Sequence, residues 1–271
     1  MSSAILQFDQ VTKTFGDFLA VKELSFAVPE GIVYGFLGGN GAGKTTSLRM
    51  ALDILEPTAG RIEIFGAPPS REMAARIGFL PEERGLYRRM SVLDTIVYFG
   101  RLKGMSPSAA RRAALHLLER LDLLGREKAK VSDLSKGLAQ KVQLATALVN
   151  APRLIMLDEP FSGLDPVNQG VLEEAIKEAA RQGSTVLFST HVMQHAERLC
   201  DQLLLLAEGK KVFEGTQDAA RARLPSRLTL TSQADPASLP GVSSTRNLGP
   251  TESNWTRYEL LLDAGTAPLP T

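Results

Sequence analysis

The chain has 271 residues, a formal net charge of +1 and a hydrophobic fraction of 44%. This nearly balanced charge gives no electrostatic reason to expect a nucleic-acid partner, and the single cysteine, Cys200, excludes an internal disulfide and fits a reducing compartment. The first residues lack a basic start and a long apolar region, so we expect no signal peptide. No stretch approaches the roughly 20 apolar residues of a membrane span, so we expect a soluble chain without direct membrane insertion.

Short apolar segments alternate with helical patterns along most of the chain. Strands are expected over residues 5–8, 24–28, 32–37, 61–65, 77–80, 154–157, 185–189 and 203–206. Helices are expected over residues 46–55, after the cap and first-turn proline at Ser106-Pro107, over 138–150, and after Asp165-Pro166. This alternation indicates an α/β fold with a mainly parallel core sheet, a β-rich N-terminal subdomain and a helical subdomain inserted at about 91–150.

The composition changes near Leu224-Pro225, where Ser, Thr and Pro become common and helical signals disappear. We therefore divide the chain into a main domain, residues 1–224, and a small C-terminal segment, residues 225–271. Residues 228–231 and 257–262 are compatible with strands. The segment is predicted to be either a small β appendage or partly disordered.

Residues 38–46 fit the pattern G-x-x-x-x-G-K-[ST] between a predicted strand and a predicted helix. Glycines let several backbone N–H groups point at one anion, and the N-terminus of the following helix favours negative charge. Lys44 is expected to reach the β- and γ-phosphates of a nucleoside triphosphate, and the Thr45 hydroxyl is placed to ligate Mg²⁺. The loop residues predicted to bind nucleotide are Gly38, Asn40, Gly41, Ala42, Gly43, Lys44, Thr45 and Thr46. A glycine-rich turn without a ligand is the alternative.

A second motif follows the apolar run at residues 154–157, which ends in Asp158 and Glu159. A buried strand would deliver Asp158 beside the phosphate loop, where its carboxylate can hold Mg²⁺ through water. Glu159 is then placed to orient or deprotonate an attacking water. A strand end with acidic, solubilising residues is the alternative.

Together these motifs resemble the nucleotide-binding subunit of an ATP-binding cassette (ABC) transporter over about residues 4–220. Residues 134–141, L-S-K-G-L-A-Q-K, are similar to the family's signature sequence L-S-G-G-Q, and residues 162–165 resemble the loop after the catalytic glutamate. His191 lies where the family has its switch histidine, and Phe15 where it has an aromatic residue that stacks on adenine. The alternatives are a helix cap for Ser135, a core aromatic for Phe15 and a structural role for His191.

The resemblance implies a P-loop ATPase in which two copies bind two ATP molecules, with Mg²⁺, between them. Lys44, Glu159 and His191 would be the catalytic residues. Ser135 and Gly137 of one copy would face the γ-phosphate held by the other copy, as part of a cofactor-binding set that also includes Phe15 and Asp165. Thr45, Asp158 and Glu82 would contact the metal.

The chain departs from the family pattern at several of these positions. Glu82 stands where glutamine is usual, Gly39 replaces a proline, and Lys136 and Leu138 replace glycine and glutamine of the signature. These forms resemble a bacterial ABC-2-type exporter branch that includes sodium and drug efflux ATPases.

The resemblance further implies a cytoplasmic subunit that is peripheral on the inner face of the cell membrane. It would power export through an integral membrane permease subunit, which would dock near residues 82–87 and the helical subdomain. A soluble ABC ATPase without a role in transport and an ATP-dependent regulatory protein are the alternatives. A GTPase is disfavoured because the chain has no N-K-x-D motif.

Overall fold

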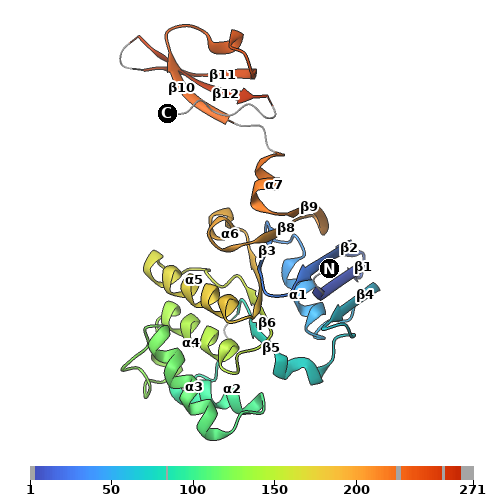
Figure 1. The fold of residues 1–271 in the computed structure, drawn as a ribbon, viewed down its shortest axis with the longest axis vertical. Coiled ribbons are helices and arrows are strands. Elements are labelled where there is room, and N and C mark those ends of the chain that lie inside the picture. The colour runs from blue at the N-terminus through green and yellow to red at the C-terminus, as the bar shows by residue number, and fades with distance from the viewer. Residues whose placement is uncertain (1–3, 84, 224–226, 252–253, 264–271) are drawn as a thin grey trace. The chain divides into compact units, whose positions relative to one another are not determined.

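The computed structural model describes residues 4–83, 85–223, 227–251 and 254–263. The chain divides into two compact units, Met1–Glu214 and Gly215–Thr271 (Figure 1). The boundary expected between residues 224 and 225 lies outside the described residues. None of the helices in the described part of the chain is long and apolar enough to cross a membrane.

An antiparallel sheet of three strands opens the first unit. It consists of β1 (Ala4–Phe15), β2 (Phe18–Pro29) and β4 (Ala59–Ile64), in the order β2-β1-β4. The rings of Phe8 and Phe26 stack 4.6 Å apart on its buried face. The expected strands at 5–8 and 24–28 lie within β1 and β2, which extend further because Phe15 pairs with Phe18 across a tight turn.

The central sheet of the first unit has six strands in the order β5-β6-β7-β3-β8-β9. Their bounds are β3 (Val33–Gly38), β5 (Ile77–Leu80), β6 (Leu154–Asp158), β7 (Thr185–Thr190), β8 (Gln202–Ala207) and β9 (Lys210–Gly215). All pairs from β5 to β8 are parallel. Every residue of β3, β6 and β7 is buried, as in a sheet covered on both faces. The predicted α/β fold with a mainly parallel core sheet is thus confirmed.

Helices flank this sheet and form the inserted block (Figure 1). They are α1 (Lys44–Ala51), α2 (Val92–Leu102), α3 (Pro107–Arg120), α4 (Lys136–Leu148), α5 (Pro166–Arg181) and α6 (Met193–Leu199), with the 3-10 turns η1 (Arg71–Arg76) and η2 (Val131–Asp133). The expected helix at 46–55 differs at both ends. It starts directly after Gly43, which is its N-cap, and it ends at Ala51 because Asp53 adopts a left-handed φ of 57°.

The second unit contains α7 (Gln217–Arg221) and a separate antiparallel sheet. Its strands are β10 (Arg227–Ser232), β11 (Val242–Pro250) and β12 (Thr256–Leu262), in the order β10-β12-β11, with the 3-10 turn η3 (Pro236–Ser238). Leu260 and Leu262 are its buried strand side chains. Strands β10 and β12 include residues 228–231 and 257–262, which the sequence analysis found compatible with strands. Strand β11 is not predicted from the sequence, because apolar and polar residues do not alternate along it.

Candidate functional site

The carboxyl ends of three neighbouring strands bring the chemically active motifs together. Parallel pairing sets Leu37 of β3 beside Thr190 of β7, and Asp158 of β6 beside Ser189 of β7. The phosphate loop follows β3, Glu159 follows β6, and His191 follows β7. Open parallel sheets bind ligands at this edge, so the phosphate loop shares one site with residues more than 100 positions later in the sequence.

Glycine shapes the phosphate loop where the chain turns into α1. Gly43 has a φ of 99°, and a Cβ atom there would lie 2.9 Å from the carbonyl oxygen of Ala20. A side chain would therefore be both strained and obstructed. Gly41, with a φ of 78°, adds a second left-handed turn. The unpaired N–H groups at the start of α1 follow directly, and they favour a bound anion.

Lys44 is fixed at the base of this loop. Its buried ammonium donates hydrogen bonds to the carbonyl oxygens of Gly38 at 2.7 Å and Gly39 at 3.2 Å. It also lies 3.4 Å from a carboxylate oxygen of Glu159. One cation thus connects the phosphate loop with the acidic end of β6.

Ser189 organises the two carboxylates. Its hydroxyl donates to Oδ1 of Asp158 at 2.6 Å and accepts the backbone N–H of Glu159 at 3.0 Å. Nδ1 of His191 lies 3.1 Å from both carboxylate oxygens of Glu159. Glu159 itself holds a left-handed φ of 48°, a conformation that costs free energy in a residue with a side chain and that clusters at functional sites.

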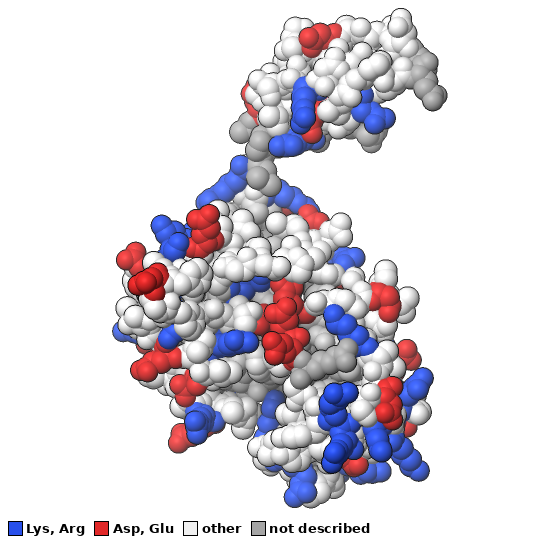
Figure 2. Space-filling model, turned by 180° about the vertical axis from the view of Figure 1, so that it is seen from behind, with Lys and Arg blue, Asp and Glu red and all other residues white. Residues whose placement is uncertain are grey.

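Lys44 and Glu159 line a hollow of about 300 Å³, whereas Asp158, Ser189 and His191 are not part of its lining. It is lined by Phe18, Ala20, Glu82, Glu159 and the loop residues Asn40, Gly41, Ala42, Gly43, Lys44, Thr45 and Thr46. Figure 2 shows acidic side chains gathered near the middle of one face of the first unit, with basic side chains around them. The lining of the hollow therefore combines a cationic, N–H-rich loop with the carboxylates of Glu82 and Glu159.

The donor chemistry of the hollow fits a magnesium ion held jointly with phosphate. Thr45 contributes a hydroxyl and Glu82 an exposed carboxylate to the lining, and the buried carboxylate of Asp158 lies at the end of β6, directly before Glu159. Within the described ranges, no group of three or more His, Cys, Asp or Glu side chains is placed to hold a metal. Mg²⁺ commonly takes one or two carboxylates together with substrate phosphates and water, which matches this partial set of ligands.

Phe15, the aromatic residue predicted to stack on adenine, does not line the hollow. It is 46% exposed, with the ammonium of Lys13 located 5.2 Å from its ring centre. Phe18, at the start of β2, lines the hollow and is 64% exposed. Contact of Phe15 with the base therefore stays a prediction. The sequence signal for Phe18 is that it is a second aromatic residue three positions after Phe15.

Ser135, Gly137 and Asp165 form a second cluster that does not line the hollow. Ser135 accepts the N–H of Leu138 and caps α4, and a Cβ atom on Gly137 would lie 3.3 Å from the side-chain nitrogen of Asn168. Asp165 caps α5, and the hydrogen bonds from Asn168 hold its pKa below the usual range. The structure thus places the signature segment against the start of α5, while the phosphate loop belongs to the other cluster.

Two further polar residues support the site and were not recognised in the sequence. Ser189 is the first of them. The sequence signal for it is its position near the end of a predicted strand, two residues before His191. Gln143 of α4 is the other, and its side-chain amide donates to the carbonyl oxygens of Pro81 at 3.0 Å and Glu83 at 3.1 Å. Gln143 therefore holds the segment that carries Glu82 into the hollow.

The comparisons with known proteins agree with this geometry. The family model described as ABC transporter matches residues 21–162. The uncharacterized ABC transporter ATP-binding protein YhaQ of Bacillus subtilis (strain 168) is 48% identical over 211 residues, which cover 78% of this chain and 71% of that protein. The Nod factor export ATP-binding protein I of Burkholderia orbicola (strain AU 1054) is 44% identical over 222 residues, or 81% of this chain and 73% of that protein.

Solved structures show the same fold. An ATP-binding subunit of an ABC transporter superposes with a TM-score of 0.73 at 29% identity, covering 80% of this chain and 92% of that chain. CbiO1 from Clostridium perfringens, described as part of the ABC transporter complex cbiONQ, gives a TM-score of 0.73 at 25% identity, covering 82% and 92%.

Proposed function

Because this chain belongs to the ABC transporter family and is an ATP-binding, ATP-hydrolysing subunit of a transporter, we propose that it drives export as a homodimer attached to a separate membrane protein. The Nod factor export proteins among its relatives support export. CbiO1, a part of a multi-subunit transporter complex by its title, supports a membrane partner. The site of action would be the inner face of the cell membrane, where ATP is available.

The proposed homodimer is supported mainly by one observation: the phosphate-loop cluster and the cluster around Ser135 are separate. The hollow contains the phosphate loop and Glu159, while Ser135 and Gly137 lie at the start of α4 and outside its lining. The N-terminus of α4 is a favourable partner for a γ-phosphate. A second copy that faces the hollow with its own Ser135 would complete the site, and ATP would then bind both surfaces at once.

Residues in the hollow and next to it would each have a definable task in hydrolysis. The loop N–H groups and Lys44 would bind the β- and γ-phosphates, so that Lys44 exchanges its contact with Glu159 for one with phosphate. Glu159 would orient the attacking water and accept its proton. His191, which contacts the Glu159 carboxylate, would keep that carboxylate in place. Mg²⁺ held by Thr45, Asp158 and Glu82 would offset the phosphate charge when bound.

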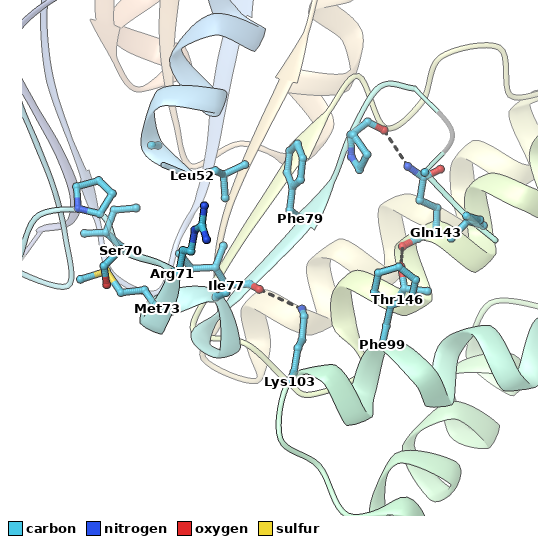
Figure 3. A pocket seen from close by; sticks show the side chains of 17 residues that line it. Leu52, Ser70, Arg71, Met73, Ile77, Phe79, Phe99, Lys103, Gln143 and Thr146 are labelled. Carbon is cyan, nitrogen blue, oxygen red and sulfur yellow. Dashed lines mark hydrogen bonds between the residues drawn. The ribbon is translucent and has the colours of Figure 1, made fainter. Parts of the chain in front are cut away.

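A second depression, which we call the docking groove, offers a place for the membrane partner (Figure 3). It has a volume of about 570 Å³ and is lined mainly by apolar side chains, among them Leu52, Ile64, Met73, Ile77, Phe79, Leu86 and Phe99. Phe79 and Pro81 line the groove, and Glu82, which follows them, lines the hollow. A cytoplasmic helix of the partner seated in the groove would thus act on the segment that holds Glu82.

Substitution of Glu159 by Gln tests the homodimer. The variant should bind ATP but hydrolyse it slowly, and size-exclusion chromatography with ATP and Mg²⁺ should show a dimer that is absent without ATP. Glu83→Gln, an exposed carboxylate in the segment after β5, serves as the matched control and should not accumulate the dimer. A Glu159→Gln protein that binds ATP and remains monomeric would contradict the two-copy site.

A further inference from the structure

The ionisable side chains that line the docking groove are cations. Among the described residues they are Arg71, at the start of η1, and Lys103, which follows α2; no carboxylate lines the groove. Arg71 is exposed, whereas Lys103 is partly buried beneath the apolar walls. The groove is therefore apolar with positive charge, although the protein as a whole is nearly neutral.

Lys103 makes its hydrogen bonds to neutral groups. Its ammonium donates to the carbonyl oxygen of Ile77 at 3.0 Å (Figure 3) and also to that of Ala147 at 3.5 Å. Within the described part of the chain, no carboxylate is close enough to form an ion pair with it. An ammonium has three donors, so one donor is left for a group that enters the groove.

A buried cation without a counter-charge is unfavourable. Burial lowers the pKa of Lys103 to about 8, so the side chain still carries its proton for most of the time at neutral pH. A carboxylate brought into the groove would compensate this charge and form a charge-assisted hydrogen bond, which is about twice as strong as a neutral one. The C-terminus of a helix supplies only about half a charge and would compensate less.

From this arrangement we propose that the membrane partner inserts an amphipathic helix whose apolar face carries one Asp or Glu, and that this carboxylate pairs with Lys103. Apolar residues on either side of the acid would contact Leu52, Phe79 and Phe99. Helices that bind in grooves use about three anchors at i, i+3 or i+4, and i+7, and the acid would occupy the central position. The inference depends on the proposed function, which supplies a membrane partner at this groove.

A display library of amphipathic helices tests the proposal on the full chain. Each peptide has about 18 residues, randomised apolar anchors at helical spacing, and a central position that is Asp, Glu, Gln, Leu or Lys. Panning uses the wild-type chain, Lys103→Met and the control Lys210→Met, an exposed lysine of β9. Circular dichroism establishes that both variants are folded.

We expect Asp and Glu at the central position to be enriched on the wild type and on Lys210→Met, with the Glu peptide binding at least about tenfold more tightly than its Gln counterpart. On Lys103→Met this preference should disappear. Equal binding of Glu and Gln peptides, an acidic preference that survives in Lys103→Met, or the absence of any selected helix would overturn the proposal. The Glu159→Gln dimer assay uses no peptide, so its result tests the proposed function separately.

Discussion

Ser189→Ala is the most direct test of how the core of the site is held together. Ser189 is fully buried. Its hydroxyl donates to Asp158 Oδ1 at 2.6 Å and accepts the backbone N–H of Glu159 at 3.0 Å. Among the described residues, no other atom makes hydrogen bonds to both of these groups. The substitution removes one small oxygen and changes the shape of the core little. Its effect should therefore come almost entirely from the two hydrogen bonds.

The expected loss of stability follows from the charge and burial of these partners. A hydrogen bond to a charged group contributes about 1.5–3 kcal/mol, and a buried N–H left without a partner costs about 1–3 kcal/mol. We expect Ser189→Ala to lower the free energy of unfolding by about 3 kcal/mol. Ser184→Ala is the matched control, because Ser184 is also buried beside β7 but makes a single neutral hydrogen bond, to the carbonyl oxygen of Pro152 at 2.7 Å. That variant should lose about 1 kcal/mol.

Urea unfolding followed by far-ultraviolet circular dichroism measures both variants. Tryptophan fluorescence is unsuitable because the single tryptophan, Trp255, lies in the second unit and would follow that unit instead of β7. The midpoint should shift without a change in slope, since the surface exposed on unfolding is the same. If Ser189→Ala costs no more than Ser184→Ala, the hydroxyl does not hold the two carboxylates and the reasoning is refuted.

Two other predictions concern buried polar groups outside the hollow. Because burial lowers the pKa of Lys103 from 10.5 to about 8, its contribution to the free energy of unfolding should rise between these pH values by about 1–2 kcal/mol. Burial also raises the pKa of Cys200, which acts in the opposite direction in wild type and variant alike. Urea titrations at about pH 8 and about pH 10 should therefore show that the stability of the wild type relative to Lys103→Met rises by about 1–2 kcal/mol. Tyr34→Phe removes a hydrogen bond from the buried phenol to Glu214, at 2.9 Å, and should lower stability by about 1.5 kcal/mol in the same assay. An unchanged midpoint would contradict that expectation.

Local patterns account for the parts of the structure that the sequence predicts well. The phosphate loop combines glycines, Lys44 and a preceding apolar strand within one short segment, and the run at 154–157 is apolar enough to be a buried strand. The caps at Ser106 and Asp165 follow from side chains that accept a backbone N–H three residues later. In each case the residues that determine the conformation are neighbours in the sequence.

The features that the sequence did not predict depend on contacts between distant segments. The role of Ser189 depends on the parallel pairing that places β7 beside β6. The position of Phe18 in the lining of the hollow depends on the turn after β1. The early end of α1 depends on Asp53, whose left-handed conformation a helix-period pattern does not reveal. Roles for Ser135 and Gly137 remain predictions, because they involve a second copy of the chain.

Strand β5 connects the docking groove to the hollow. Lys103 binds the carbonyl oxygen of Ile77, the first residue of β5, and Gln143 binds that of Pro81, directly after its last residue. Since β5 is the edge strand of the central sheet, it pairs with β6 alone and can shift with fewer broken hydrogen bonds than an inner strand. A partner carboxylate that binds Lys103 would therefore act on one end of the segment whose other end places Glu82 beside the phosphate loop.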